Sequence, residues 1–138
     1  MLTRVTPGGE GRQTLVLRAT PAAAREARVW LTSVAATLLE PPRREDLELV
    51  MSEVVTNAIR HGRPEGDILL AATPKEGYLC VQVTDDGPGL VPRPGAMGSE
   101  EHGGFGLFLV ELLTRRWGVT REGGRTRVWF ELDYAAAA

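Results

Sequence analysis

Glu53-Val-Val-Thr-Asn57-Ala-Ile-Arg-His61-Gly62 is the stretch of this sequence that says most about the fold. Its polar residues Glu53, Asn57 and His61 are spaced by four and therefore form one line along a helix. That line flanks an apolar stripe, which consists of Leu47, Met51, Val54 and Ala58. Polar side chains at the edge of a core need hydrogen-bonding partners. Those partners could be other groups of the protein or a bound ligand, and this helix alone does not decide between them.

Helix and strand signals follow this segment in both directions. Before it, we expect a strand over 13–19 and a helix from Pro21 to about 39 that ends at Pro41-Pro42. The central helix is expected over 44–60, with Gly62 as its C-cap. Further expected elements are strands at 67–73 and 78–84, a loop at 90–102, a helix at 104–117 and a strand at 125–133. This order predicts an α+β two-layer sandwich with helices on one face of the sheet.

Length and composition limit the classes of protein to consider. The 138 residues suit one domain, which we expect over 13–134, with a flexible arm at 1–12 and a flexible tail at 135–138. A net charge of −2 and the lack of a long apolar run predict no direct nucleic acid binding, no membrane span and a cytoplasmic location. Lys75 is the only lysine, so no G-K-[ST] phosphate loop is present. Cys80 is the only cysteine, which excludes an intrachain disulfide.

The sequence Asp85-Asp86-Gly87-Pro88-Gly89 follows the second expected strand. Alternation places Leu79, Val81 and Val83 on one face of that strand, and Asp85 continues their parity. An inward carboxylate is costly unless it meets a hydrogen-bond donor, and the amino group of adenine is such a donor. The glycines would let the backbone approach a base closely. An ordinary Asp-Gly turn is the alternative for this motif taken alone.

A second glycine-rich signal, Gly103-Gly104-Phe105-Gly106-Leu107, opens the last expected helix. Its glycines would expose backbone N–H groups at the positive end of the helix dipole, which suits phosphate. Close packing of the loop on the helix is the alternative. The segment 90–102 lies between the two glycine-rich motifs, in the position of a lid.

In this order the three motifs resemble the N, G1 and G2 boxes of the GHKL ATPase superfamily, which has the Bergerat fold. That resemblance implies a two-layer α/β sandwich with a mixed, mostly antiparallel sheet. Two phrases, Ser52-Glu53-Val54-Val55-Thr56-Asn57 and Gly104-Phe105-Gly106-Leu107-Phe108, look most similar to the stand-alone anti-sigma factor serine kinases of bacteria. One departure is Phe105, where relatives often carry a polar or basic residue.

The resemblance also implies roles for individual residues. Glu53 would be the catalytic base, and Asn57 would hold Mg²⁺. Asp85 would bind adenine, and His61 would lie within the ATP site. Thr126 shares the inward parity of Val128 and Phe130 and would be a second hydrogen-bonding partner near the base. The residues implied to shape the pocket and the lid are Gly87, Gly89, Gly104, Gly106 and Leu107.

The implied activity is that of a protein serine kinase using ATP and Mg²⁺. Such a regulator phosphorylates an anti-sigma factor antagonist protein and sequesters a sigma factor, and a homodimer is compatible with it. Two alternatives stay open. One is an ATP-dependent protein-binding switch with little or no kinase activity, which Phe105 and the short lid would suit. The other is the catalytic part of a split sensor histidine kinase, whose acceptor histidine would belong to another protein.

Overall fold

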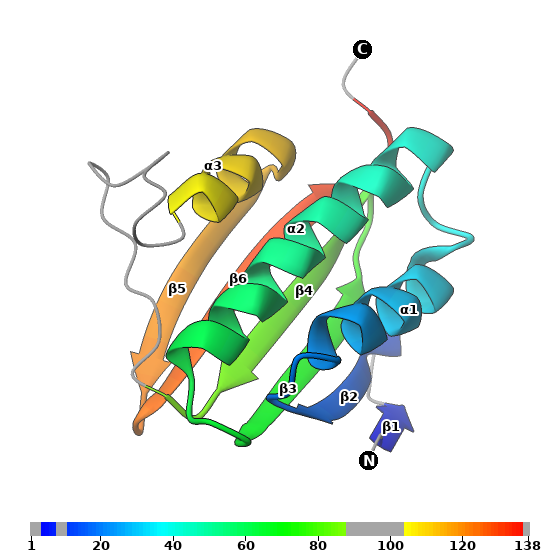
Figure 1. The fold of residues 1–138 in the computed structure, drawn as a ribbon. Helices are drawn as coiled ribbons and strands as arrows, with labels where there is room; N and C mark the ends of the chain where they lie inside the picture. Colours follow the sequence, from blue (N-terminus) through cyan, green and yellow to red (C-terminus); the bar gives the residue numbers. More distant parts are fainter. Residues whose placement is uncertain (1–3, 8–10, 88–103, 137–138) are drawn as a thin grey trace.

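A computed structural model of the chain describes residues 4–7, 11–87 and 104–136. Its strands form one six-stranded sheet in the order β1-β2-β3-β4-β6-β5 (Figure 1). The strands are β1 (Arg4–Pro7), β2 (Gln13–Arg18), β3 (Asp67–Pro74), β4 (Tyr78–Asp85), β5 (Arg116–Glu122) and β6 (Arg125–Asp133). The helices are α1 (Ala23–Ala35), α2 (Pro41–His61) and α3 (Gly104–Leu113).

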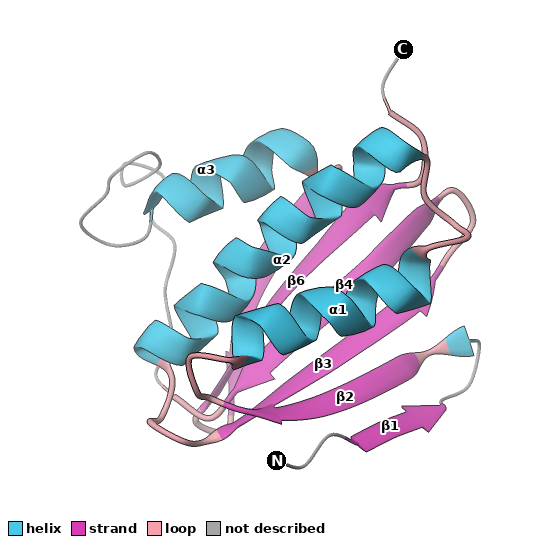
Figure 2. Ribbon diagram, turned by 45° about the vertical axis from the view of Figure 1, so that its right-hand side comes forward, coloured by secondary structure: helices cyan, strands magenta, loops and turns pink. Residues whose placement is uncertain are grey.

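All three helices cover the same face of the sheet, as Figures 1 and 2 show from two directions. The core lies between these layers. Met51 on α2 and Phe130 on β6 are fully buried there, together with the alternate residues Leu79, Val81 and Val83 of β4. The predicted two-layer α+β sandwich is therefore confirmed. Among the described residues, no helix is both long and apolar enough to span a membrane.

The boundaries of α1 and α2 differ from those expected. Pro41 and Pro42 do not end the first helix but occupy the first turn of α2, where a proline ring costs no helical hydrogen bond. α1 already ends at Ala35. Gly62 is confirmed as the C-cap of α2, and its backbone N–H donates to Ala58 O at 2.9 Å. Arg60 and His61 in the last turn interact favourably with the helix dipole.

The region after α3 was predicted incorrectly. The helix expected over 104–117 ends at Leu113, and Arg116–Glu122 forms the edge strand β5. Gly123 and Gly124, with φ of 60° and 77°, make the tight turn from β5 to β6. Pairing of β5 with β6 replaces the last expected turn of this helix, and it places Trp117 opposite the buried Phe130.

Two further features of the sheet differ from expectation. Within the arm expected at 1–12, Arg4–Pro7 forms a strand that pairs with β2. Every pairing between the described strands is antiparallel, whereas a mixed sheet was expected. β4 and β5 run in the same direction, but β6 folds back from β5 and lies between them. Residues 137–138 of the expected tail lie outside the described part of the chain.

Arg43 ties the far end of the helical layer to the sheet. Its guanidinium donates to Asp133 O at 3.1 Å, to Leu113 O at 2.9 Å and to the Asp46 carboxylate at 2.8 Å. The residue is buried, so these bonds satisfy donors that would otherwise be lost to water. The C-terminal end of α3 is thereby held beside the first turn of α2.

Candidate functional site

Asp85 ends β4 with its side chain on the helix-covered face of the sheet. Only 4% of its surface is exposed, as the strand parity predicted. The carboxylate atom Oδ1 accepts a hydrogen bond from the backbone N–H of Gly87 at 2.8 Å. No hydrogen bond within the described part of the chain engages the other oxygen, Oδ2. A buried carboxylate with a spare acceptor is suited to a ligand that brings an N–H donor.

The C-terminal end of α2 packs directly on the turn that follows Asp85. A Cβ added at Gly87 would lie 2.4 Å from the Cα of Gly62 and 2.7 Å from the carbonyl oxygen of His61. A Cβ at Gly62 would come within 3.2 Å of Asp85 Oδ1. Backbone contact between α2 and the turn therefore requires glycine at position 87. At position 62 a Cβ would meet Ala58 O at 2.4 Å within α2 and the Asp85 side chain beyond it. The sequence suggested approach of a ligand at Gly87, and the structure provides an internal reason for the same residue.

β6 supplies a second layer of contacts to this turn. Thr126 lies opposite Asp85 in the strand register and is 1% exposed. Its hydroxyl donates to Gly87 O at 3.1 Å. The hydroxyl proton is thus used within the protein, and the Thr126 oxygen retains lone pairs with which it can accept a hydrogen bond. Asp85 and Thr126 meet as predicted, and the role of Thr126 toward a base stays a prediction.

Glu53 and Asn57 lie on the flank of α2 that faces α3. α1 lies along the other flank, where Arg28 donates to Ser52 Oγ at 3.2 Å. Arg43, which donates to the end of α3, precedes Asn57 by almost four helical turns. Asn57 is buried with 6% exposure, and Glu53 is half-buried. The predicted polar line therefore borders the space between the two helices.

α3 begins at Gly104, as the glycine-rich signal predicted. The side chain of Leu107 is buried on this helix, with 3% exposure. Gly106 lies in its first turn. Gly89 and the expected lid at 90–102 lie outside the described residues, so their assigned roles stay predictions.

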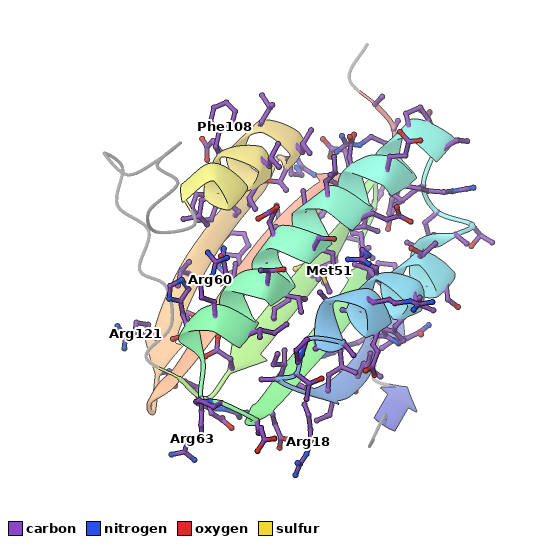
Figure 3. The ribbon with its side chains drawn as sticks, viewed as in Figure 1. Arg18, Met51, Arg60, Arg63, Phe108 and Arg121 are labelled. Atoms are coloured by element: carbon purple, nitrogen blue, oxygen red, sulfur yellow. The ribbon has the colours of Figure 1, made fainter. Side chains whose placement is uncertain are left out.

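Burial raises the pKa of the Asp85 carboxyl above its ordinary value. The hydrogen bond from Gly87 acts to lower that pKa, the Asp86 carboxylate raises it, and His61 and Arg121 lower it. Arg121, on β5, lies opposite Thr126 of β6, and its side chain is exposed. Figure 3 shows Arg121 projecting from β5 and Arg60 projecting from α2 near the same end of the molecule. Positive charge thus borders the buried carboxylate.

These groups fit an adenine nucleotide with Mg²⁺ in their chemistry. Asp85 offers an acceptor for an exocyclic amino group, and the buried Asn57 offers an amide oxygen of the kind that Mg²⁺ accepts. The N-terminus of α3 presents backbone N–H groups and the positive end of a helix dipole.

Sequence reasoning missed several residues of this site. Gly62 was expected only as a helix cap, although it also contacts the Asp85 turn. Arg121 was missed because no strand was expected between the helix at 104–117 and the Gly123-Gly124 turn. The Gly123-Gly124 pair, flanked by alternating apolar residues, is a hairpin signal that could have found that strand.

The chain is similar to known proteins over most of its length. The family model described as "Histidine kinase-like ATPase domain" matches residues 17–132. The chain is 35% identical over 83 residues to the serine-protein kinase RsbW of Listeria monocytogenes, a match covering 50% of this chain and 53% of that protein. It is 37% identical over 82 residues to the uncharacterized protein SCO4941 of Streptomyces coelicolor, covering 56% of this chain and 76% of that protein.

Solved structures show the same fold. The RsbU and RsbW domains of Rv1364c from Mycobacterium tuberculosis superpose with a TM-score of 0.65 at 22% identity, covering 92% of this chain and 34% of that chain. The histidine kinase domain of the blue-light activated kinase from Erythrobacter litoralis gives a TM-score of 0.53 at 30% identity, covering 67% and 45%. The chain spans about half the length of the RsbW relatives that it matches.

Proposed function

The chain belongs to the histidine kinase-like ATPase domain family, and on that basis we propose that it binds Mg·ATP and phosphorylates a serine on an anti-sigma factor antagonist protein. We further propose that it sequesters a sigma factor. The phosphorylated antagonist would not release the sigma factor from this chain. Homology to RsbW, a serine-protein kinase, supports the choice of chemistry. A sigma factor as partner would put this activity in the cytoplasm.

The observation that carries the proposal is the buried Asp85 carboxylate, which lies against the end of α2 and whose Oδ2 accepts no hydrogen bond from the described residues. In the proposed complex, Asp85 accepts a hydrogen bond from the adenine amino group. Asn57 holds Mg²⁺ through its amide oxygen, and the backbone N–H groups at Gly104 and Gly106 bind phosphate. Mg·ATP supplies the γ-phosphoryl group and a metal ion that neutralises its charge.

Glu53 is the proposed base. It takes the proton from the serine hydroxyl as that oxygen bonds to the γ-phosphorus, and the bond from the γ-phosphorus to ADP breaks. Its position one turn before Asn57 and its half-buried side chain support this proposed role. A base in this position contributes about 10²- to 10⁴-fold to the rate.

The binding step is tested by calorimetry with ATP in the presence and absence of Mg²⁺. We expect Asp85→Asn to lose adenine-specific binding, because the single amide oxygen cannot replace both carboxylate oxygens, one for the Gly87 N–H and one for the adenine amino group. Asn57→Ala should lose the dependence on Mg²⁺. A folded wild type that does not bind ATP would refute the proposed function.

The transfer step is tested by intact-mass analysis of an antagonist protein incubated with Mg·ATP and the chain. Glu53→Gln should lower the transfer rate by about 10²- to 10⁴-fold and leave ATP affinity unchanged. Glu48→Gln is the matched control, because Glu48 lies on the other flank of α2, where Thr32 contacts it at 3.5 Å. Equal rates for Glu53→Gln and the wild type would remove Glu53 from the mechanism. No transfer by a wild type that binds ATP would favour an ATP-dependent binding switch.

One comparison favours a second candidate, the catalytic part of a split sensor histidine kinase. The Erythrobacter litoralis histidine kinase domain is 30% identical to this chain over the matched part. Phosphohistidine is labile in acid, whereas phosphoserine is stable in acid and labile in base. The acid and base stability of the phosphorylated product therefore separates the two candidates.

A further inference from the structure

Two neighbouring side chains of β6 hold the Asp85 turn from opposite faces of the sheet. Thr126, on the helix-covered face, donates to Gly87 O at 3.1 Å. Arg125, on the uncovered face, donates through Nε to Asp86 Oδ1 at 2.9 Å. Asp86 is the residue between Asp85 and Gly87, so both contacts act on the same three-residue turn. Under the proposed function, the Thr126 contact supports the turn that carries Asp85. The Arg125 contact on the uncovered face has no role in that function so far.

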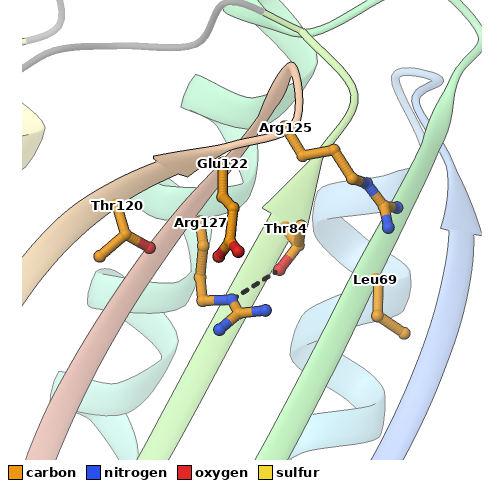
Figure 4. Close-up of a pocket in the computed structure, with 6 residues that line it drawn as sticks. All are labelled: Leu69, Thr84, Thr120, Glu122, Arg125 and Arg127. Carbon is orange, nitrogen blue, oxygen red and sulfur yellow. Dashed lines mark hydrogen bonds between the residues drawn. The ribbon is translucent and has the colours of Figure 1, made fainter.

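The Arg125 contact lies at a shallow depression on the uncovered face. This depression has a volume of roughly 290 Å³ and is lined by Leu69, Thr84, Thr120, Glu122, Arg125 and Arg127 (Figure 4). Arg127 also lies on β6 and faces the same side, but within the described ranges its one hydrogen bond goes to Thr84 Oγ1, at 3.5 Å. Among the described residues, Arg127 makes no ion pair. The two arginines therefore differ in whether they reach the turn.

We propose that Arg125 is a positioning residue for nucleotide binding, which acts from the far face of the sheet by holding Asp86 and thereby fixing the orientation of Asp85. This inference rests on the proposed function. The side chain of Asp86 is 33% exposed, and Arg125 is its ion-pair partner. The positive charge of Arg125 offsets the repulsion between the carboxylates of Asp86 and Asp85, and this offset would be lost without Arg125. The turn would then be held on the covered face alone.

The size of the effect follows from the exposure of the pair. The side chain of Arg125 is 48% exposed, so solvent and salt weaken the attraction. Ion pairs of this kind change an equilibrium constant by at most about fivefold. A recognition group works best when its geometry is held within about 0.5 Å, so a small shift of the turn is enough to be measured in affinity.

The test is a double-mutant cycle with Arg125→Gln and Asp86→Asn, using calorimetry with Mg·ATP at low salt. Each single substitution should weaken binding by about three- to fivefold, and the double variant should bind no more weakly than either single one. Raising the salt concentration should bring the wild type closer to the variants. Arg127→Gln, the matched control on the same face, should bind as the wild type does.

A second measurement does not depend on nucleotide. Hydrogen exchange of the Gly87 amide, which donates to Asp85 Oδ1 at 2.8 Å, reports on the turn itself. We expect about three- to fivefold faster exchange in Arg125→Gln and no change in Arg127→Gln. Amides in the centre of β4 should exchange at the wild-type rate in both variants, which a general loss of stability would not allow.

The outcomes separate the inference from the proposed function. A wild type that binds no adenine nucleotide would overturn both. If the wild type binds and Arg125→Gln binds equally well, only the positioning role of Arg125 is overturned. Additive losses in the cycle, or equal Gly87 exchange in the Arg125 and Arg127 variants, would also overturn it. Coupled losses together with faster Gly87 exchange would support it.

Discussion

Gly87→Ala tests whether contact between α2 and the Asp85 turn determines the identity of this glycine. The added Cβ would lie 2.4 Å from Gly62 Cα, 2.7 Å from Gly62 C and 2.7 Å from His61 O. Carbon atoms in contact lie about 3.5–4.0 Å apart, so α2 and the turn must separate by roughly 1 Å. All three contacted atoms are backbone atoms, and rotation of a side chain would not relieve the clash.

The cost of this substitution has two parts. Overpacking costs about 1–3 kcal/mol, and each hydrogen bond weakened by the movement costs about 1 kcal/mol. The bonds at risk are Gly87 N–H to Asp85 at 2.8 Å and Thr126 to Gly87 O at 3.1 Å. We expect a total loss of about 2–4 kcal/mol, or about 8–16 °C in Tm for a domain of this size.

The sign of the effect decides the argument. Gly87 does not have a positive φ, so alanine there would stabilise the fold by about 0.4–1 kcal/mol if space allowed. Urea unfolding followed by tryptophan fluorescence measures the free energy of unfolding. Gly124→Ala is the control, since its Cβ would meet nothing within 4 Å and only its φ of 77° costs about 1–2 kcal/mol. A Gly87→Ala variant as stable as the wild type would refute the contact argument.

Three further predictions concern the core and the titrating groups. Because burial raises the pKa of Asp85 in the folded state, its ionised form opposes folding. The Tm of Asp85→Asn relative to wild type should therefore rise as pH increases through that raised folded pKa, and a pH-independent difference would contradict this. Phe130→Ala, at a fully buried position, should cost about 3–5 kcal/mol in urea unfolding. Phe108→Ala, at a 44% exposed position, should cost less than half as much, and equal losses would argue against the assigned core. Burial, aided by Glu131, raises the pKa of the Cys80 thiol, so it should react with a thiol reagent more slowly at pH 8 than in the unfolded chain; equal rates would contradict this.

Local pattern was sufficient where a residue's environment depends on its own element. The period of two along β4 predicted that Asp85 faces inward, and the glycines before Leu107 predicted where α3 begins. Spacing by four placed Glu53 and Asn57 on one flank of α2. Joined in order, these signals identified the family from the sequence, and the match over residues 17–132 confirms it.

Pattern failed where distant segments decide the structure. The helix that begins at Gly104 was expected to continue to 117, but pairing with β6 makes Arg116–Glu122 a strand. β1 was missed for the same reason, since Arg4–Pro7 gains its hydrogen bonds only from β2. Pairing of this kind depends on a partner strand, so its energy does not appear in the residues of one strand alone.

The sequence by itself determined most of the helices and strands, the inward carboxylate and the order of the motifs, because these follow from periods of 2 and 3.6 residues along the chain. Only the tertiary structure brought Gly62 against Gly87 and aligned Arg125 with Asp86. Those contacts join residues 25 and 39 positions apart in the chain. They exist because the C-terminal ends of α2 and β4 and the N-terminal end of β6 meet at the same edge of the sandwich, and that meeting is a property of the packed layers.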